Sequence, residues 1–263
     1  MSQIAVQQLL FEPPLDHVVN VASVRQLSPF RYPGGKTWLI PRIRRWLRNP
    51  PAQFIEPFAG GGIVSLTVAA ENLAQHVTMV ELDEQVAAVW QTIFTDGQAD
   101  WLVEKIRDFN LTVDSLREEL ARPAESTCEK AFQTILKNRT FHGGILAAGA
   151  APIKRGENGK GIQSRWYPET LSNRICELAK LRGRVTFIQG DGLTLLTQYA
   201  TSTDIAFFID PPYTAAGKRA GRRLYTHSDL DHAELFNLAS AVREIFDDIR
   251  KLSMWALARQ LWF

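Results

Sequence analysis

The residues with the clearest chemical capacity are Asp210, Pro211, Pro212 and Tyr213, which follow a short apolar run. Residues 205–209 are predicted to form a buried strand, and the prolines end it because neither can donate a hydrogen bond to a sheet. The strand therefore delivers a carboxylate, a rigid carbonyl and an aromatic ring into one loop. These groups suit a planar amino group, since two acceptors can take its hydrogens while the ring stacks on its face. The alternative is a strand that ends in an ordinary proline-rich surface turn.

A glycine-rich turn follows a predicted first strand over residues 53–56 and precedes an apolar helix over 63–73. Consecutive glycines between a strand and a helix let a ligand approach the backbone without a Cβ in the way. This turn supplies the cofactor-binding candidates Glu56, Pro57, Phe58, Gly60 and Gly62.

A second predicted strand, residues 77–82, carries Glu81 near its end, and Asp83 follows. A nucleotide-binding fold keeps a carboxylate for ribose hydroxyls about twenty residues after its glycines. A solvated strand end is the plainer interpretation. With Ser65 at the third glycine position the dinucleotide fingerprint is loose, so an NAD enzyme also stays open, although no hydride-transfer partner is identifiable.

Tyr32 and Lys36 belong to another glycine-rich turn, which leads into a helix predicted over residues 38–47. A phosphate loop is excluded, because that motif needs a glycine where Phe30 stands and a strand immediately upstream. The turn places a ring and a lysine near a helix N-terminus, which suits a cofactor with an adenine ring and a carboxylate. A simple helix-capping turn is the alternative.

Asp191 follows a third predicted strand, residues 185–188, which comes after a helix over 168–181. Strands of an open parallel sheet share one ligand crevice at their carboxyl ends, so we expect Asp191 to reach the same crevice. The adenine amino group of a cofactor is a reasonable partner for it.

The elements between the second and third strands are predicted to be helices over residues 84–94, 101–120 and 129–136. These long helical stretches interrupt the alternation of strand and helix and indicate an inserted subdomain. We expect an α/β chain with one domain in residues 29–95 and 182–263, an inserted, mainly helical and loop region in 96–181, and an N-terminal arm in 1–28.

Basic residues gather in two places, which suits a partner rich in phosphates. The first is a glycine-rich, mobile surface in which Glu157 is the one acid among basic side chains, and its candidates are Lys154, Arg155, Lys160 and Arg165. The second follows the proline loop, and its candidates are Lys218, Arg219, Arg222 and Arg223. An exposed loop without a partner is the alternative for the first group.

The chain has 263 residues, 45% of them hydrophobic, and a net charge of +2, which is too mild to indicate nucleic-acid binding without such clusters. Cys128 and Cys176 match no metal or redox spacing, and His227 and His232 lack metal-ligand spacing, so no metal site is expected. The two separated cysteines make a reduced, cytoplasmic setting the simplest inference. We also find neither a membrane span nor the layout of a signal peptide.

Together, the sequences Tyr32-Pro33-Gly34-Gly35-Lys36, Glu56-Pro57-Phe58-Ala59-Gly60-Gly61-Gly62 and Asp210-Pro211-Pro212-Tyr213 resemble the Dam-type DNA adenine-N6 methyltransferases in the alpha arrangement. The resemblance implies a Rossmann-like sheet, S-adenosylmethionine as cofactor and flipped-out adenine in double-stranded DNA as substrate. It assigns the cofactor to Tyr32 and Lys36, its ribose to Glu81 and its adenine to Asp191. The catalytic loop would be residues 210–213, in a catalytic domain formed by residues 29–95 and 182–263. The inserted region 96–181 would recognise the target sequence. A separate cognate restriction endonuclease is a partner that the family allows.

The resemblance runs from about Pro29 to about Phe236, and residues 246–263 do not show the strand and hairpin expected there. After a helix predicted over 231–245, the closing run 254–263 has helical spacing. We therefore expect missing C-terminal strands in a truncated or rearranged form with reduced stability and turnover. A catalytically impaired S-adenosylmethionine- or DNA-binding protein, and a methyltransferase acting on RNA or a small molecule, remain the alternative functions.

Overall fold

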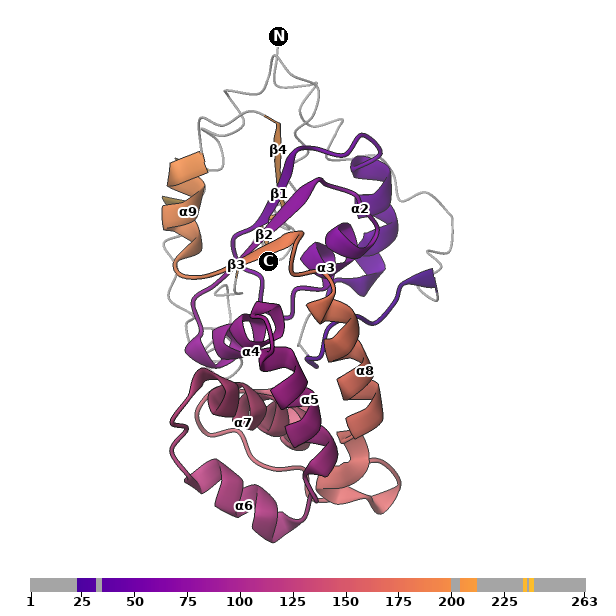
Figure 1. Ribbon diagram of the computed structural model, residues 1–263, viewed down its shortest axis with the longest axis vertical. Coiled ribbons are helices and arrows are strands. Elements are labelled where there is room, and N and C mark those ends of the chain that lie inside the picture. The colour runs from indigo at the N-terminus through magenta and orange to yellow at the C-terminus, as the bar shows by residue number, and fades with distance from the viewer. Residues whose placement is uncertain (1–22, 32–34, 200–203, 212–233, 236, 239–263) are drawn as a thin grey trace, which may run out of the picture.

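The computed structural model describes residues 23–31, 35–199, 204–211, 234, 235, 237 and 238 (Figure 1). Several predictions lie outside these residues: most of the N-terminal arm, the helix over 231–245 apart from four positions, and the closing run 254–263. The same holds for the candidate residues Tyr32, Pro212, Tyr213, Lys218, Arg219, Arg222 and Arg223.

Within the described residues, four strands form one parallel sheet in the order β3-β2-β1-β4 (Figure 1). Their bounds are β1 Gln53–Glu56, β2 His76–Glu81, β3 Val185–Gln189 and β4 Ile205–Phe207. The predicted α/β class and the four predicted strands are confirmed. β4 ends two residues earlier than residues 205–209 would require, although the Phe208 N–H still donates to the Ile55 carbonyl at 2.9 Å.

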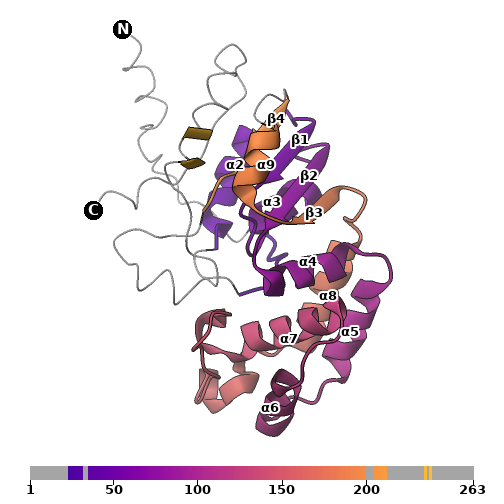
Figure 2. The same ribbon diagram turned by 90° about the vertical axis from the view of Figure 1, so that its left-hand side faces the viewer.

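The two faces of the sheet bury alternate residues of its strands. Phe54 and Phe208 join the cluster under α2 (Ile40–Trp46) and α3 (Ile63–Ala70), whereas Ile55 and Phe207 join the cluster under α9 (Gly192–Tyr199). A short 3-10 helix, η2 (Thr37–Leu39), precedes α2. α9 lies on the opposite side of the sheet from α2 and α3 (Figure 1), and Figure 2 views the molecule from the α9 side. Helices on both faces are what a parallel sheet requires.

A helical part lies between β2 and β3 in sequence and below the sheet in Figure 1. Its elements are α4 Glu84–Phe94, α5 Gln98–Asp108, α6 Val113–Ala121, α7 Thr127–Thr140, η3 His142–Gly144, η4 Glu157–Gly159, η5 Gly161–Arg165 and α8 Pro168–Ala179. Trp90, Phe132 and Ile175 belong to the same hydrophobic cluster as Phe54 of the sheet. The helical part therefore shares one core with a face of the sheet.

The single helix predicted over residues 101–120 is wrong, because the chain breaks into α5 and α6. Thr112 starts α6 with a capping box in which its hydroxyl accepts the Ser115 N–H at 3.0 Å and the Ser115 hydroxyl accepts the Thr112 N–H at 2.9 Å. Phe109 in the connection packs edge-on against Phe132 and Trp166. Capping and burial of this ring outweigh the continuous helical pattern.

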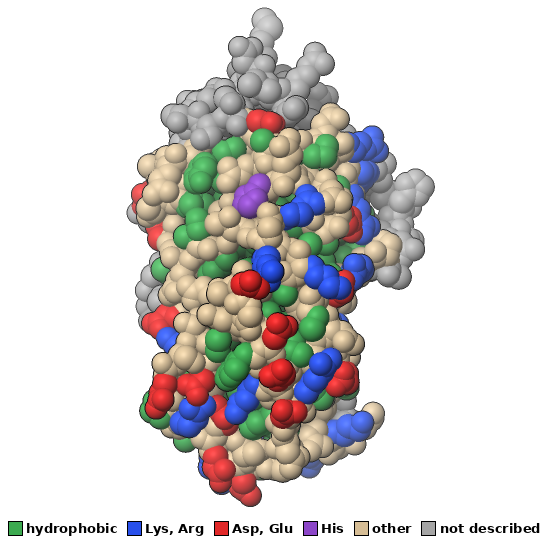
Figure 3. Space-filling view, in the orientation of Figure 1, with side chains coloured by type: hydrophobic (Ala, Val, Ile, Leu, Met, Phe, Trp, Pro, Cys, Tyr) green, Lys and Arg blue, Asp and Glu red, His purple; other side chains and the backbone are tan. Residues whose placement is uncertain are grey.

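The described surface mixes charges of both signs, and Figure 3 shows Lys, Arg, Asp and Glu side chains interspersed on one face. Cys128 and Cys176 are both half-buried free thiols. Among the described residues, none of the helices combines the length and apolarity that a membrane span needs. No group of three or more His, Cys, Asp or Glu side chains in this part of the chain is arranged to hold a metal ion.

Candidate active site

A carboxyl side chain stands at the carboxyl end of each described strand. Glu56 and Glu81 are the last residues of β1 and β2, and Asp191 and Asp210 follow shortly after β3 and β4. β4 pairs with β1 on the side opposite to β2, so the strand order reverses between β1 and β4. Ligand crevices of open parallel sheets lie at this kind of reversal. Glu56 and Asp210 lie at or just after the ends of the two strands on either side of this reversal, and Glu81 and Asp191 lie at or just after the ends of the next two strands of the sheet.

Lys36 and Asp210 join the N-terminal turn to the loop after β4. The Lys36 Nζ lies 2.5 Å from Asp210 Oδ2, with side-chain exposures of only 8% and 18%. Lys36 is the N-cap of η2, and Pro211 follows Asp210 directly. Two sequence motifs from distant parts of the chain thus meet in one ion pair.

Glu56 lies beside this ion pair and is almost completely buried. Its Oε2 accepts the Ser65 N–H at 3.1 Å at the start of α3. Burial is the main cause that raises the pKa of Glu56 to about 8, and the negative charge of Asp210 adds to the rise. Hydrogen bonds from Ser65 and the positive charge of Lys36 act in the opposite direction. Glu56 therefore holds a proton at neutral pH.

Glu81 holds the glycine-rich turn in place. Its Oε2 accepts the Gly60 N–H at 2.8 Å and its Oε1 accepts the Asp83 N–H at 2.9 Å. Burial raises the pKa of Glu81, while these backbone hydrogen bonds oppose the rise. The Trp90 indole N–H fixes the other side of the turn by donating to the Gly60 carbonyl at 2.9 Å.

Asp83, the other acid at the end of β2, is the N-cap of α4. Its Oδ1 accepts the N–H groups of Gln85 at 2.8 Å and Val86 at 3.2 Å. Of the two acids, Glu81 is therefore the one that contacts the glycine-rich turn.

Gly192, next to Asp191, lies against the glycine-rich turn after β1 because it lacks a side chain. A Cβ on Gly192 would lie 2.3 Å from the Pro57 carbonyl oxygen and 2.9 Å from a ring carbon of Phe58. The Asp191 carboxylate accepts the backbone N–H of Thr194 at 3.1 Å and its hydroxyl at 2.9 Å, so it caps α9. The start of α9 therefore packs on Pro57 and Phe58, and this contact brings the loop that carries Asp191 to the glycine-rich turn.

The basic surface after α7 folds back on itself. Phe141 and Pro152 form an antiparallel bridge, and the Gly161 N–H donates to the Arg155 carbonyl at 2.7 Å. The side chains of Lys154, Arg155 and Lys160 are exposed, whereas Arg165 is half-buried. The first three are presented to solvent, as a phosphate-binding surface requires.

Sequence reasoning missed Asn138, which is fully buried at the end of α7. Its Oδ1 accepts the Arg31 N–H at 2.8 Å, and its Nδ2 donates to the carbonyls of Arg31 at 2.9 Å and Gly144 at 2.7 Å. It fastens the chain ahead of the N-terminal turn to the helical part. A lone asparagine in a helical pattern carries no signal of such a long-range contact.

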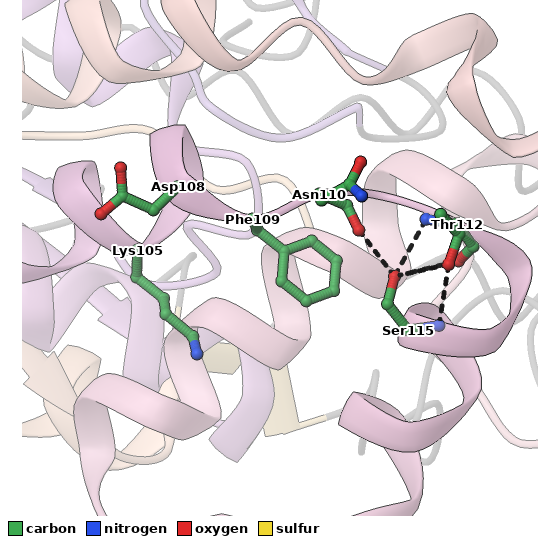
Figure 4. A pocket seen from close by; sticks show the side chains of 6 residues that line it. All are labelled: Lys105, Asp108, Phe109, Asn110, Thr112 and Ser115. Carbon is green, nitrogen blue, oxygen red and sulfur yellow. Dashed lines mark hydrogen bonds between the residues drawn. The ribbon is translucent and has the colours of Figure 1, made fainter.

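A separate pocket of about 330 Å³ lies at the α5–α6 connection, on the helical side of the molecule (Figure 4). It is lined by Lys105, Asp108, Phe109, Asn110, Thr112 and Ser115. Figure 4 shows the Ser115 hydroxyl bonded to Asn110 and Thr112, which is the cap of α6. The groups of this pocket serve local structure, so we place the candidate site at the sheet edge.

Comparison with known proteins gives two similarities that cover most of the chain. Residues 32–256 match the family described as D12 class N6 adenine-specific DNA methyltransferase. The Type II methyltransferase M.MjaIII of Methanocaldococcus jannaschii is 23% identical over 241 residues, which cover 84% of this chain and 81% of that protein. The family match extends to residue 256, beyond Phe236, where the sequence motifs suggested that the resemblance ends.

Proposed function

Because this chain belongs to the D12 class N6 adenine-specific DNA methyltransferase family, we propose that it methylates adenine in double-stranded DNA at the Lys36–Asp210 site, with S-adenosylmethionine as the methyl donor. Adenine-N6 DNA methylation is the activity of the family, and a Type II methyltransferase is among the relatives of the chain. The observation that carries the placement is the ion pair between the N-terminal turn and the loop after β4, beside the protonated Glu56.

Asp210 and the Pro211 carbonyl are the acceptors for the target amine. The adenine N6 lone pair is delocalised into the ring, so the amine is a weak nucleophile. Acceptors that take both of its hydrogens favour a pyramidal nitrogen whose lone pair can attack. Orientation contributes more to this reaction than strong base catalysis does. The ion pair with Lys36 fixes the direction of the Asp210 carboxylate.

Glu56, Glu81 and Asp191 lie at or just after the ends of neighbouring strands, which supports a cofactor site at this edge of the sheet. S-adenosylmethionine supplies an electrophilic methyl group on a sulfonium. Glu81 would accept the ribose hydroxyls, and its bond to Gly60 keeps its carboxylate at the glycine-rich turn. Asp191 would face the adenine, since the neighbouring Gly192 packs against Pro57 and Phe58 of the glycine-rich turn. Tyr32 and Lys36 would close the site from the N-terminal turn.

The DNA substrate requires a further step, because the target amine is unreachable inside a duplex and the base must be flipped out. Tyr213 would stack on the flipped base, at about 1–3 kcal/mol for one aromatic contact. Residues 96–181 would serve as the target-recognition region, with Lys154, Arg155 and Lys160 on backbone phosphates.

The experiment that tests this function is incubation with labelled S-adenosylmethionine and unmodified duplex DNA, followed by mapping of the labelled base. We expect label on adenine N6. An RNA of the same sequence in a parallel reaction is the control. Label on RNA alone would contradict the proposal and favour an RNA methyltransferase. Bound cofactor without transfer to either nucleic acid would contradict it and favour a binding protein.

A further inference from the structure

We propose that Arg31, Arg139, Arg165 and Arg174 form a binding site for a backbone phosphate of DNA, next to the chain that leads into the N-terminal turn. The inference rests on the proposed function for the identity of the polyanion. It adds a phosphate site in which arginines of α7 and α8 act together with the N-terminal segment.

The geometry brings arginines from separate elements onto one short stretch of backbone. Arg139, in the last turn of α7, donates from Nη2 to the Pro29 carbonyl. Arg174 of α8 donates from Nη1 to the Ser28 carbonyl at 3.2 Å. Consecutive carbonyls thus receive guanidinium groups from two helices, and Arg31 lies two residues after Pro29.

Three arginines of this cluster lack a countercharge in the part of the chain that the structure describes. None of Arg31, Arg139 and Arg174 forms an ion pair with a described carboxylate. Glu177, one turn along α8, is already paired with Arg25 at 3.7 Å and with Lys180 at 2.5 Å.

Arg139 itself is only 6% exposed, and its Nε has no hydrogen-bond partner among the described atoms. Buried charges in proteins are normally paired, since an unpaired one loses its hydration without compensation. A guanidinium in this condition indicates that an anion completes the site.

The electrostatics agree with this geometry. Burial lowers the pKa of Arg139 to about 10, and the like charges of Arg174, Arg31 and Arg165 contribute to the decrease. Burial also lowers the pKa of Arg31, with Arg165 adding to the effect and Tyr167 opposing it. Like charges are therefore held together and repel one another, and a bound anion would relieve the repulsion.

A phosphate suits the site better than other anions. Guanidinium groups bind phosphate oxygens through paired N–H donors, and several of them can share one phosphate. Arg165 ends the basic loop that carries Lys154, Arg155 and Lys160, so a DNA backbone that follows this loop arrives at the cluster. The carboxylate of the cofactor is the other anion that could bind here, and the test separates the two.

The test compares Arg31→Gln and Arg174→Gln with Arg182→Gln. Arg31 holds Asn138 only through its backbone, so its side chain can be changed without loss of those bonds. Arg182 is an exposed arginine paired with Asp96, and its change removes the same charge away from the cluster. Affinity for a mixed-sequence DNA duplex is measured at several salt concentrations without cofactor, and cofactor affinity is measured by calorimetry.

We expect Arg31→Gln and Arg174→Gln each to reduce the log-log salt slope by about 0.9, the value for one phosphate that is no longer neutralised, while Arg182→Gln keeps the wild-type slope. Wild-type salt slopes in both cluster variants would overturn the proposal. If cofactor affinity then also fell more than about ten-fold, the cluster would bind the carboxylate of the cofactor and not a DNA phosphate. If Arg174→Gln does not fold, Arg31→Gln decides. If the cluster variants show the reduced salt slope but the wild-type chain does not methylate adenine, the phosphate site is supported and the proposed function is contradicted.

Discussion

At the residue scale, Asp210 is the side chain on which the chemistry depends. Asp210→Ala should abolish methyl transfer and leave cofactor affinity within a few-fold, because the carboxylate acts on the target amine. Single-turnover transfer of labelled methyl groups and calorimetric cofactor titration measure the two effects. Asp114→Ala is the matched control, since Asp114 is an exposed acid on α6. Turnover retained in Asp210→Ala would exclude this role.

Glu56 should make the stability of the protein depend on pH. Its pKa rises from an ordinary value of 4.5 to about 8 in the fold, so the folded state retains a proton that the unfolded chain releases. The free energy of unfolding therefore falls as pH rises from about 4.5 to about 8, by at most about 1.4 kcal/mol per pH unit, and then levels off.

Glu56→Gln should remove the part of this pH dependence that Glu56 causes, because glutamine has no proton to lose, and the part from the raised pKa of Glu81 should remain. Thermal melts of the wild type and the variant at a series of pH values across this window measure the effect. Parallel curves for the two proteins would show that Glu56 ionises normally in the fold.

Substitutions of Glu81 and Asp83 should have different effects, one on cofactor binding and the other on stability. Glu81→Ala should weaken cofactor binding by roughly 1–3 kcal/mol, the cost of leaving ribose hydroxyls without an acceptor. Asp83→Ala should instead lower the stability of the fold by about 1 kcal/mol through the lost cap of α4 and leave cofactor affinity unchanged. Calorimetry and denaturant unfolding separate the two. Equal cofactor affinity in Glu81→Ala and the wild type would move the ribose site elsewhere.

The residues of the candidate site differ in how far sequence could predict them. Glu56, Glu81, Asp191 and Asp210 were predicted because they follow apolar strand patterns, and the end of a parallel strand faces the crevice. The contact between Lys36 and Asp210 depends on how the N-terminal turn packs, which local patterns do not encode. Asn138 and Arg139 were missed for the same reason, since burial of a polar side chain is decided by tertiary contacts.

At the element scale, α7 holds the segment that precedes the N-terminal turn, through the hydrogen bonds of Asn138 to the backbone of Arg31. Asn138→Ala should leave the Arg31 N–H and the carbonyls of Arg31 and Gly144 without partners, at about 1–3 kcal/mol for each buried group that water does not reach. Thr134→Val is the control, because Thr134 is also buried on α7 but bonds only within the helix, to the Lys130 carbonyl. Denaturant unfolding of both variants gives the difference, and equal losses would contradict the fastening role.

The strands were predictable because each is a short apolar run with a turn signal at its end. The break between α5 and α6 was not, since residues 101–120 keep helical spacing through the connection. Its cause is the reciprocal capping of Thr112 and Ser115 together with the packing of Phe109, and only the second of these depends on distant residues. A Thr-x-x-Ser pattern inside a helical stretch is a signal that could have found the break.

At the scale of the whole molecule, the fold class followed from the alternation of strands and helices, but the continuity of the core did not. Trp90 and Phe132 of the helical part share a cluster with Phe54 of the sheet. Periodicity identifies which face of a helix is apolar and not which surface it meets. The division into a catalytic domain and an inserted region therefore stays a prediction, and an insertion here would share its core with the sheet.

DNA binding by the whole molecule should be divided between the exposed loop and the arginine cluster. Neutralising Lys154, Arg155 and Lys160 to Gln should reduce the log-log salt slope by about 0.9 for each phosphate that the loop no longer binds. Arg107, Arg117 and Lys180, which are surface cations paired with acids, provide a control of equal charge change. If loop and cluster contact different phosphates of one duplex, the reductions from the loop variant and from Arg31→Gln should add in the combined variant. A combined slope no lower than that of the loop variant would mean that both act on the same phosphate, and an unaltered slope in the loop variant would exclude the loop from the DNA interface.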